Sequence, residues 1–320
     1  MKILIVKTSS MGDIIHALPV VQDIVANRAD CEIHWVAEES FRDIPTLAPA
    51  VKAVHVCAFR RWRKSLFSRE TCAEIRAFKA ALRAEHYDLV IDIQGLLRSG
   101  LLTHWTKAPS VGYTRGTIRE PLAAFFYHQH LDLPESLGAV RRYRMALANA
   151  LGYEIQGDPR FALSAQDTSW LADQREPFVA LAINTSRDEK LWPEASWMAL
   201  GQRLATVGLR SALFWGNAKE RERSEAVASQ IPGAVVVPRL SLSQTAATLA
   251  QASAVIGVDT GLSHLGAALG RPSVGIFVST PTETLQLIGD GPVRSLGGIG
   301  VCPSLEDVWQ AFEAVRGELK

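Results

Sequence analysis

A single carboxylate stands at the end of a short loop near the amino terminus. The loop reads KTSSMGD and ends at Asp13; it follows the apolar run ILIV and precedes the helix-like segment IIHALPVVQDIV. It contains neither GxGxxG nor GxxxxGK[ST], so it lacks the glycines with which nucleotide-binding loops approach phosphate. A carboxylate held at a helix start can act as a general base. The alternative is that Asp13 only caps the helix.

A second group of polar residues follows an apolar run in the other half of the chain. In VIGVDTGLSHLGAALGRPSVGIF a strand pattern ends at Asp259, and a helix is expected to begin near Leu262. Free backbone N–H groups at a helix start bind anions, and Gly261 allows close approach of a ligand. Asp259 suits sugar hydroxyls, and His264 in the first turn suits a phosphate. The alternative is that Asp259 and Thr260 only cap the helix, with His264 a packing residue.

Hydroxyls and a cation follow another predicted strand in the segment NTSRDEKLWP. There Thr185 and Ser186 offer hydrogen bonds, and Lys190 would neutralise charge that builds on a diphosphate leaving group. The alternative for this segment is a solvated turn. Farther on, FWGNAKERERSE places Glu220 near a strand exit, where it suits ribose hydroxyls, although glutamates in such charged runs are commonly solvated.

Basic residues surround a tryptophan in the segment FRRWRK. Arginine forks bind carboxylates and phosphates through two hydrogen bonds, and an exposed tryptophan offers a flat face to a sugar or to a membrane interface. The segment therefore predicts a site for an anionic acceptor, with a solvated charged face as the alternative. Its basic residues are Arg60, Arg61, Arg63 and Lys64, around Trp62.

The bulk composition excludes several classes of protein. The 320 residues carry 34 Lys+Arg and 33 Asp+Glu, a formal net charge of +1, which argues against a nucleic acid as partner. The four cysteines form no CxxC pair and give no zinc motif. The first residues carry too short an apolar run for a signal peptide, and no run approaches the length of a membrane span, so we expect a cytoplasmic protein.

Short apolar runs alternate with longer amphipathic segments along the whole chain. This alternation predicts an α/β protein with parallel sheets that are covered on both faces. The segment 153–170, whose glycine, proline and small polar residues are typical of a linker, separates two series of strands. We therefore expect two Rossmann-like domains over 1–160 and 161–320. The final helix is a candidate to pack back on the first domain.

The apolar pattern places the individual elements as follows. Strands are expected at 2–7, 32–37, 52–57, 88–93, 110–113, 178–183, 210–214, 234–237, 254–258 and 273–277, and helices at 70–86, 194–208 and 304–318. The apolar segment LAAFFYHQHL, 122–131, is expected to be core, with a membrane-surface helix as the alternative.

Several of these segments together resemble a known family. MKILIVKTSSMGDIIHALP, RRWRK, DIQGLLRS, REPLAAFFY and VDTGLSHLGAALGRP are similar to the lipopolysaccharide heptosyltransferases of glycosyltransferase family 9, ADP-heptose-dependent enzymes of the GT-B fold. The resemblance runs from Met1 to at least Pro272, and KTSSMGD followed by RRWRK favours the heptosyltransferase I branch. It implies inverting transfer of L-glycero-D-manno-heptose from ADP-heptose to the first Kdo of Kdo₂-lipid A. It also implies peripheral association with the cytoplasmic face of the inner membrane, where the lipopolysaccharide inner core is built.

The resemblance also assigns roles to matching positions. It implies Asp13 as the base and Lys190 as the neutraliser of the leaving diphosphate; an inverting transfer needs one base and one such group, so a lone carboxylate suffices. The implied acceptor contacts fall in 1–160, and the implied ADP-sugar contacts fall in 161–320. The acceptor contacts are Lys7, Ser10, Gly12, Arg60, Arg61, Arg63 and Lys64, and the donor contacts are Thr185, Ser186, Lys190, Glu220, Asp259, Thr260, Gly261, Leu262 and His264.

The chain also departs from the family pattern in two places. Gly138 stands where the family commonly has histidine, and VSTPTE replaces the expected Gly-Pro-Thr-Asp-Pro after strand 273–277. The chain contains no DxD motif, so we expect no obligatory metal and no cofactor besides the donor substrate.

Three other functions stay open at this point. A heptosyltransferase II-like enzyme would act on an already heptosylated core. A Rossmann oxidoreductase would need the GxGxxG that is missing here. A non-catalytic sensor would bind an ADP-sugar without releasing ADP when acceptor is supplied.

Overall fold

The computed structural model describes residues 1–166 and 176–318, so part of the expected linker 153–170 lies outside the described residues. The chain forms two compact units, Met1–Phe161 and Ala162–Lys320. This division lies one residue from the expected boundary after residue 160.

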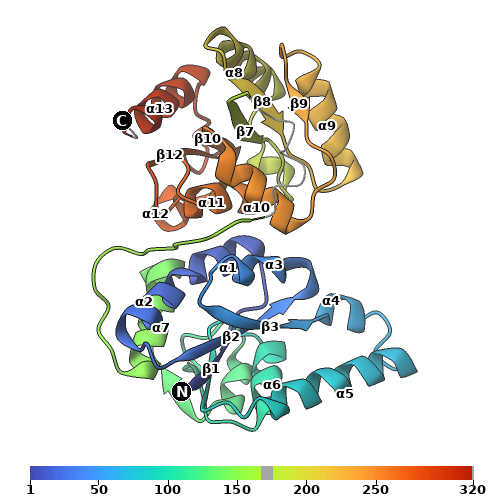
Figure 1. Ribbon diagram of the computed structural model, residues 1–320, viewed down its shortest axis with the longest axis vertical. Helices are drawn as coiled ribbons and strands as arrows, with labels where there is room; N and C mark the ends of the chain where they lie inside the picture. Colours follow the sequence, from blue (N-terminus) through green and yellow to red (C-terminus); the bar gives the residue numbers. More distant parts are fainter. Residues whose placement is uncertain (167–175, 319–320) are drawn as a thin grey trace. The chain divides into compact units, whose positions relative to one another are not determined.

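The first unit contains a six-stranded sheet in which all neighbouring strands are parallel (Figure 1). Its central strand is fully buried from Ile3 to Val6, as expected for a parallel sheet that is covered on both faces. The strand order is β3-β2-β1-β4-β5-β6. The strands are β1 (Lys2–Val6), β2 (Glu32–Glu38), β3 (Val51–Cys57), β4 (Leu89–Asp92), β5 (Ser110–Tyr113) and β6 (Gln129–Leu131).

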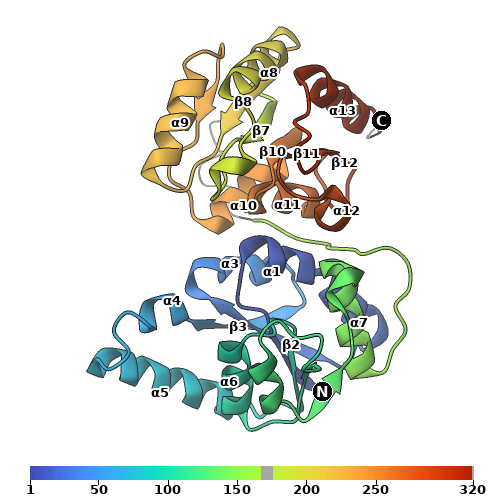
Figure 2. The ribbon, with the colours of Figure 1, turned by 180° about the vertical axis from the view of Figure 1, so that it is seen from behind.

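Helices connect these strands and cover the two faces of the sheet (Figures 1 and 2). Leu4 and Val6 of β1 share a buried cluster with Phe78 and Leu102, which belong to the helices α5 and α6. On the other face α7 contacts both α1 and α2. The α-helices are α1 (Met11–Ala17), α2 (Pro19–Asn27), α3 (Asp43–Thr46), α4 (Phe59–Trp62), α5 (Arg69–Ala84), α6 (Leu97–Thr106) and α7 (Ala139–Leu151); the 3₁₀ turns are η1 (Glu39–Phe41), η2 (Pro121–Phe126) and η3 (Glu135–Leu137).

The second unit repeats this architecture. Its six strands are also all parallel, in the order β12-β11-β10-β7-β8-β9. The strands are β7 (Phe178–Ala182), β8 (Arg210–Leu213), β9 (Val235–Val236), β10 (Ala254–Val258), β11 (Ser273–Phe277) and β12 (Val293–Gly297). The helical elements are η5 (Asp188–Lys190), α8 (Glu194–Thr206), α9 (Ala218–Ala228), α10 (Leu242–Gln251), α11 (Gly261–Ala268), α12 (Thr282–Leu285) and α13 (Leu305–Gly317).

The last helix, α13, packs on the sheet of its own unit. Its buried Val308, Phe312 and Val315 belong to the same apolar cluster as Val274 and Ile276 of β11. The docking surface of α13 is therefore the second unit, which corrects the expectation that this helix packs back on the first.

Two edge strands and one helix break differ from the sequence expectation. The strands β6 and β12 lie at sheet edges, where a strand has one neighbour and needs no continuous apolar run. The segment IIHALPVVQDIV forms two helices, α1 and α2, because Pro19 has no N–H to continue the first one. These three differences do not affect the inner strands of either sheet.

The segment 122–131 is only partly core. It forms most of η2 and then β6, and the side chains of Leu122 and Phe125 are 56% and 71% exposed. The expectation of a core segment was therefore wrong for these two residues. Among the described residues, no helix is both long enough and apolar enough to cross a membrane.

Each sheet has a point where the direction of strand addition reverses. In the first unit β2 follows on one side of β1 and β4 lies on the other; in the second, β8 and β10 flank β7 in the same way. Loops that leave the carboxyl ends of strands on either side of such a reversal diverge and form a crevice, where α/β proteins bind ligands. Asp13 lies on the segment after β1, Lys190 on the segment after β7, and Asp259 directly after β10.

Candidate active site

The loop after β1 holds Asp13 at the start of α1. The backbone N–H and the hydroxyl of Ser10 donate to Asp13 Oδ2 at 2.9 and 2.8 Å. The loop itself is fixed by Gln94 from the neighbouring strand end, because its Oε1 accepts the N–H groups of Thr8 and Ser9. Asp13 therefore caps α1 with one oxygen and is also positioned at the strand reversal, so capping does not exclude a catalytic role.

The surroundings of Asp13 keep it ionised at neutral pH. Burial by itself would raise its pKa, but the positive charge of Lys7 and the hydrogen bonds from Ser10 hold the pKa below the usual value of an aspartate. Lys7 is buried, and burial lowers its pKa to about 8 although Asp13 and Asp92 counteract this. At neutral pH a largely protonated lysine thus lies beside an ionised aspartate.

A pocket of about 620 Å³ opens beside Asp13. Besides the loop after β1, the loops after β4 and β5 contribute to it, so its walls come from three strand ends. Two arginines bring positive charge, and Arg98 Nη2 donates to Ser9 Oγ at 3.2 Å. The lining residues are Ser9, Ser10, Asp13, Gln94, Leu96, Leu97, Arg98, Arg119 and Glu120.

No role was assigned from the sequence to the residues that line this pocket from the segments after β4 and β5. Gln94 and Arg98 lie in DIQGLLRS, and Glu120 lies in REPLAAFFY, two segments that carried the family resemblance without a role. A signal was present, because DIQGLLRS directly follows the apolar strand β4. Only the order of the strands shows that this segment lies beside the loop of Asp13.

The basic segment at 60–64 is in a different part of the first unit. Arg60 and Arg61 belong to α4, which follows β3, and Arg63 and Lys64 come directly after this helix. None of these four residues is among those that line the pocket of Asp13. Trp62 is buried and donates to Glu74 Oε2 at 2.8 Å, so the expectation of an exposed tryptophan face was wrong. Arg61 pairs with Glu39 and Glu74, which leaves it less free to bind an acceptor.

In the second unit, polar residues gather around Asp259 at the end of β10. Lys190 Nζ donates to Asp259 Oδ2 at 2.5 Å, and Thr280 donates to the same oxygen at 2.8 Å. His264 Nε2 lies 3.6 Å from Oδ1, and the hydroxyl of Thr185 donates to the backbone carbonyl of Asp259 at 3.2 Å. The loops after β7, β10 and β11 thus meet at one carboxylate.

This network makes Asp259 strongly acidic. Its burial would raise the pKa, but the bonds from His264, Lys190 and Thr280 lower the pKa far below the usual value. The carboxylate is consequently charged at all ordinary pH values, and Lys190 is held in place by it. Since an ammonium group has three N–H donors, the lysine still has donors for an anionic ligand.

The start of α11 lies beside this cluster. Thr260 is the N-cap residue of α11, and its side chain makes no capping hydrogen bond. The first backbone N–H groups of a helix, here those of Gly261 and Leu262, have no carbonyl acceptor within the helix and are therefore available to an anion. His264 is buried in the first turn, and Ser186, on the loop after β7, is exposed.

Glu220 uses part of its hydrogen-bonding capacity within the turn that begins α9. Its carboxylate accepts the N–H of Gly216 at 2.7 Å and the amide of Asn217 at 2.8 Å, so it fixes the turn between β8 and α9. This places Glu220 at a strand exit, as expected. A carboxylate that accepts two bonds still has lone pairs for a ribose hydroxyl.

The two departures from the family pattern have different outcomes. Gly138 has φ +75° at the start of α7, a left-handed conformation that glycine adopts without strain and histidine does not. Thr280 lies in the altered segment VSTPTE and bonds to Asp259, so this segment contributes to the second site. No local pattern in the sequence assigns a role to Thr280.

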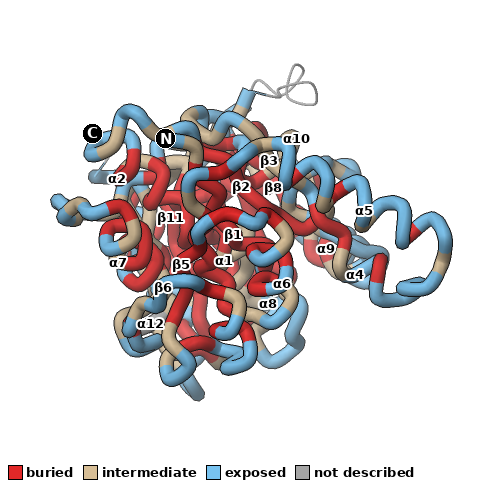
Figure 3. Tube along the Cα trace, turned by 90° about the horizontal axis from the view of Figure 1, so that it is seen from below, coloured by how far each residue is buried: buried red, intermediate tan, exposed pale blue. Residues whose placement is uncertain are grey.

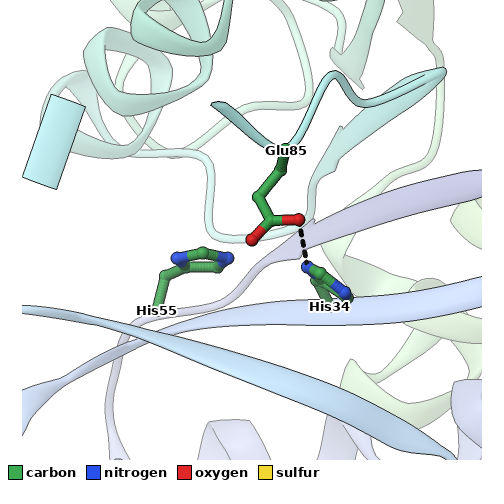
Figure 4. A group of neighbouring side chains, drawn as sticks. All are labelled: His34, His55 and Glu85. Carbon is green, nitrogen blue, oxygen red and sulfur yellow. Dashed lines mark ion pairs between the residues drawn. The ribbon is translucent and has the colours of Figure 1, made fainter. Parts of the chain in front are cut away.

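A third titratable cluster consists of His34 on β2, His55 on β3 and Glu85 at the end of α5 (Figure 4). Ligand atoms of His34, His55 and Glu85 lie within 4.8 Å of one another, which is close enough to suggest a metal site. However, the hydroxyl of Tyr87 already bridges both imidazoles, and Lys2 Nζ lies 2.9 Å from Glu85. The hydrogen-bonding groups of this cluster are therefore occupied by one another. Their contacts link β1, β2 and β3 with the end of α5.

Comparison with known proteins points in the same direction as this geometry. The model of the family described as Glycosyltransferase family 9 (heptosyltransferase) matches residues 75–302. The lipopolysaccharide heptosyltransferase 1 of Pseudomonas aeruginosa is 42% identical over 284 residues, which cover 88% of this chain and 79% of the relative.

Solved structures extend the likeness to nearly the whole chain. The E. coli heptosyltransferase WaaC with ADP is 38% identical and has a TM-score of 0.91, covering 98% of this chain and 99% of that chain. The same heptosyltransferase with ADP-2-deoxy-2-fluoro heptose has a TM-score of 0.86 at the same identity and coverage. The expected fold class, α/β with two Rossmann-like domains of the GT-B type, is thereby confirmed.

Proposed function

Because this chain belongs to glycosyltransferase family 9, the heptosyltransferases, we propose that it transfers L-glycero-D-manno-heptose from ADP-heptose to the first Kdo of Kdo₂-lipid A. The reaction inverts the anomeric carbon and builds the inner core of lipopolysaccharide. The relative named heptosyltransferase 1 supports this acceptor, and the structures solved with ADP and with a fluorinated ADP-heptose support the donor.

The observation that carries the proposal is the ionised Asp13 in an open pocket beside two arginines. In an inverting transfer the acceptor hydroxyl attacks the anomeric carbon opposite the leaving nucleotide, and one base takes its proton. Asp13 is charged at neutral pH and has Oδ1 beyond its capping bonds, so it is suited to this task. Arg98 and Arg119 supply the charge that an acceptor carboxylate such as that of Kdo needs.

The donor side needs groups that stabilise negative charge on the departing ADP. Lys190 provides a fixed ammonium, and the start of α11 provides backbone N–H groups at the positive end of the helix dipole. Thr185 and Ser186 add hydroxyls, His264 is placed for a phosphate, and Glu220 is placed for the ribose. We propose that these groups serve without an obligatory metal, consistent with the lack of a DxD motif.

The acceptor is a membrane lipid, so the proposal includes peripheral association with the inner membrane at its cytoplasmic face. The exposed basic side chains of α4 and the turn after it, among them Arg60, Arg63 and Lys64, are suited to the phosphates of such a lipid.

Release of ADP tests the proposal. Purified protein is supplied with ADP-heptose, with and without Kdo₂-lipid A, and we expect ADP release that depends on the acceptor. Release with a heptosylated core but not with Kdo₂-lipid A would instead indicate the heptosyltransferase II-like alternative. Binding of ADP-heptose without release under either condition would indicate a sensor.

A further inference from the structure

The turn that connects α4 to α5 presents an aromatic side chain to solvent. Phe67 is 93% exposed and its neighbour Leu66 is 49% exposed, whereas Trp62 at the end of α4 is buried. In Figures 1 and 2 this connection lies at the outer end of the first unit, away from the sheet, and Figure 3 colours it as exposed. An exposed phenylalanine on an outlying turn costs solvation free energy, which suggests an apolar partner.

The turn holds Phe67 outward through its own hydrogen bonds. Ser68 caps α5 by accepting the N–H of Thr71 at 3.1 Å, and its own N–H donates to the carbonyl of Ser65 at 3.0 Å. The hydroxyls of Ser65 and Thr71 are also 3.1 Å apart. The exposure of Phe67 is therefore built into the turn.

Positive charge surrounds this apolar tip. Between residues 60 and 70 there are five basic residues and one acidic residue. Arg61 is neutralised by Glu39 and Glu74, whereas Arg63, Lys64 and Arg69 are exposed and have no ion-pair partner among the described residues. Basic residues beside a protruding aromatic side chain are the composition of segments that bind anionic lipid surfaces.

We propose that the turn at 63–69 is the membrane-docking element of this protein. Phe67 and Leu66 enter the interfacial region of an anionic bilayer, and Arg63, Lys64 and Arg69 contact the headgroups. The inference rests on the proposed function for its setting, because the proposed acceptor is itself embedded in a membrane. It goes beyond that function by assigning the contact to one turn and by making the bilayer, not the acceptor alone, the partner.

Binding to vesicles without any substrate tests the proposal. The full-length protein is sedimented with vesicles of phosphatidylethanolamine and phosphatidylglycerol, and with neutral phosphatidylcholine vesicles as reference. We expect binding to the anionic vesicles that weakens with salt, and a partition coefficient that is roughly tenfold lower for Phe67→Ser. Phe125→Ser, which removes another exposed phenylalanine of the first unit, serves as the matched control and should bind like the wild type.

Three results would overturn the assignment. These are wild-type binding by Phe67→Ser, an equal loss in Phe125→Ser, and a concentration-dependent dimer in light scattering that Phe67→Ser abolishes, since the tip would then contact a second copy. Thermal unfolding of both variants shows whether each is folded.

A kinetic comparison separates docking from catalysis. With a deacylated, water-soluble acceptor, Phe67→Ser should turn over like the wild type, whereas KM for acceptor embedded in vesicles should rise. Loss of turnover on the soluble acceptor would place Phe67 in the active site and would contradict the proposal. If wild-type protein binds vesicles as expected but releases no ADP with any acceptor, the proposed function fails while the docking inference stands.

Discussion

Asp13 and Asp259 each lie at the strand reversal of their own sheet, but their partners differ. Ser10 donates to Oδ2 of Asp13, and Asp13 also lines an open pocket of about 620 Å³. Asp259 receives bonds from Lys190 and Thr280 and has His264 beside its other oxygen. One fold therefore supplies a carboxylate free to accept a proton in the first unit and one that fixes a cation in the second.

The comparison suggests why one base and one fixed ammonium are enough. In the proposed reaction the carboxylate of Asp13 takes up a proton through Oδ1, which lies beyond the hydrogen bonds from Ser10. The enclosed carboxylate cannot do so, because three neighbouring side chains depend on it. Variants at the two positions should consequently lose activity in different ways.

Asp13→Asn should lower turnover by about 10²–10⁴-fold, the usual contribution of a positioned base. The free energy of unfolding should change by about 1 kcal/mol or less, because asparagine is also compatible with a helix start. Steady-state ADP release and thermal unfolding measure the two effects. Asp30→Asn, at an exposed carboxylate of the same unit, is the control. Near-normal turnover of Asp13→Asn would show that Asp13 only caps α1 and is not the base.

Asp259→Asn should damage both stability and donor binding. Lys190 would lose its partner while still partly buried, so the free energy of unfolding should fall by about 1–3 kcal/mol. The affinity for ADP-heptose should fall as well, because the ammonium is no longer fixed. Denaturant unfolding and donor titration measure these changes, with Glu313→Gln on the exposed side of α13 as control. Unchanged stability would show that the Asp259 network is not structural.

Lys7→Met should shift the acid limb of kcat/KM to higher pH, because Asp13 loses the positive charge that lowers its pKa. The variant also tests Lys7 directly. Burial lowers its pKa from 10.5 to about 8, so between these values the unfolded chain binds more protons and this lysine makes stability rise with pH. The rise should be about 3 kcal/mol at most in the wild type and absent in Lys7→Met. An unmoved acid limb would show that Lys7 does not tune Asp13.

Thr280→Val should have the smallest effect. It removes one hydrogen bond to Asp259 Oδ2, so we expect about 1 kcal/mol of lost stability. The KM for ADP-heptose should rise by a few-fold. Thr185→Val, which removes a bond to the backbone carbonyl of Asp259, is the comparison and should leave the pKa of the carboxylate unchanged. Equal donor KM values for Thr280→Val and the wild type would place Thr280 outside the donor site.

The inner strands could be predicted from the sequence because burial on both faces demands continuous apolar runs. This is why 110–113, 254–258 and 273–277 coincide with β5, β10 and β11. The edge strands β6 and β12 carry no such demand, and QHL and VRSLG resemble many loops. Their place in the sheet depends on neighbours that are far away in the chain.

The candidate site was predictable where a residue follows a strand or begins a helix. Asp13, Lys190 and Asp259 belong to this class. Residues such as Arg98 and Thr280 were missed because they reach the site only through the strand order, which local patterns do not contain. Trp62 is a case where a local pattern was misleading, because its basic neighbours suggested an exposed side chain. In the structure Phe59 and Phe78 pack against its ring, and its indole N–H donates to Glu74.

Chemical rescue of Asp13→Ala tests whether the carboxylate of Asp13 is the base. The pocket beside Asp13 is open enough to admit formate, so formate can supply the missing carboxylate. If Asp13 is the base, ADP release by Asp13→Ala is nearly lost and is partly restored as formate is added, with no such restoration for Asp259→Ala. Turnover of Asp13→Ala at the wild-type rate without formate would contradict this role.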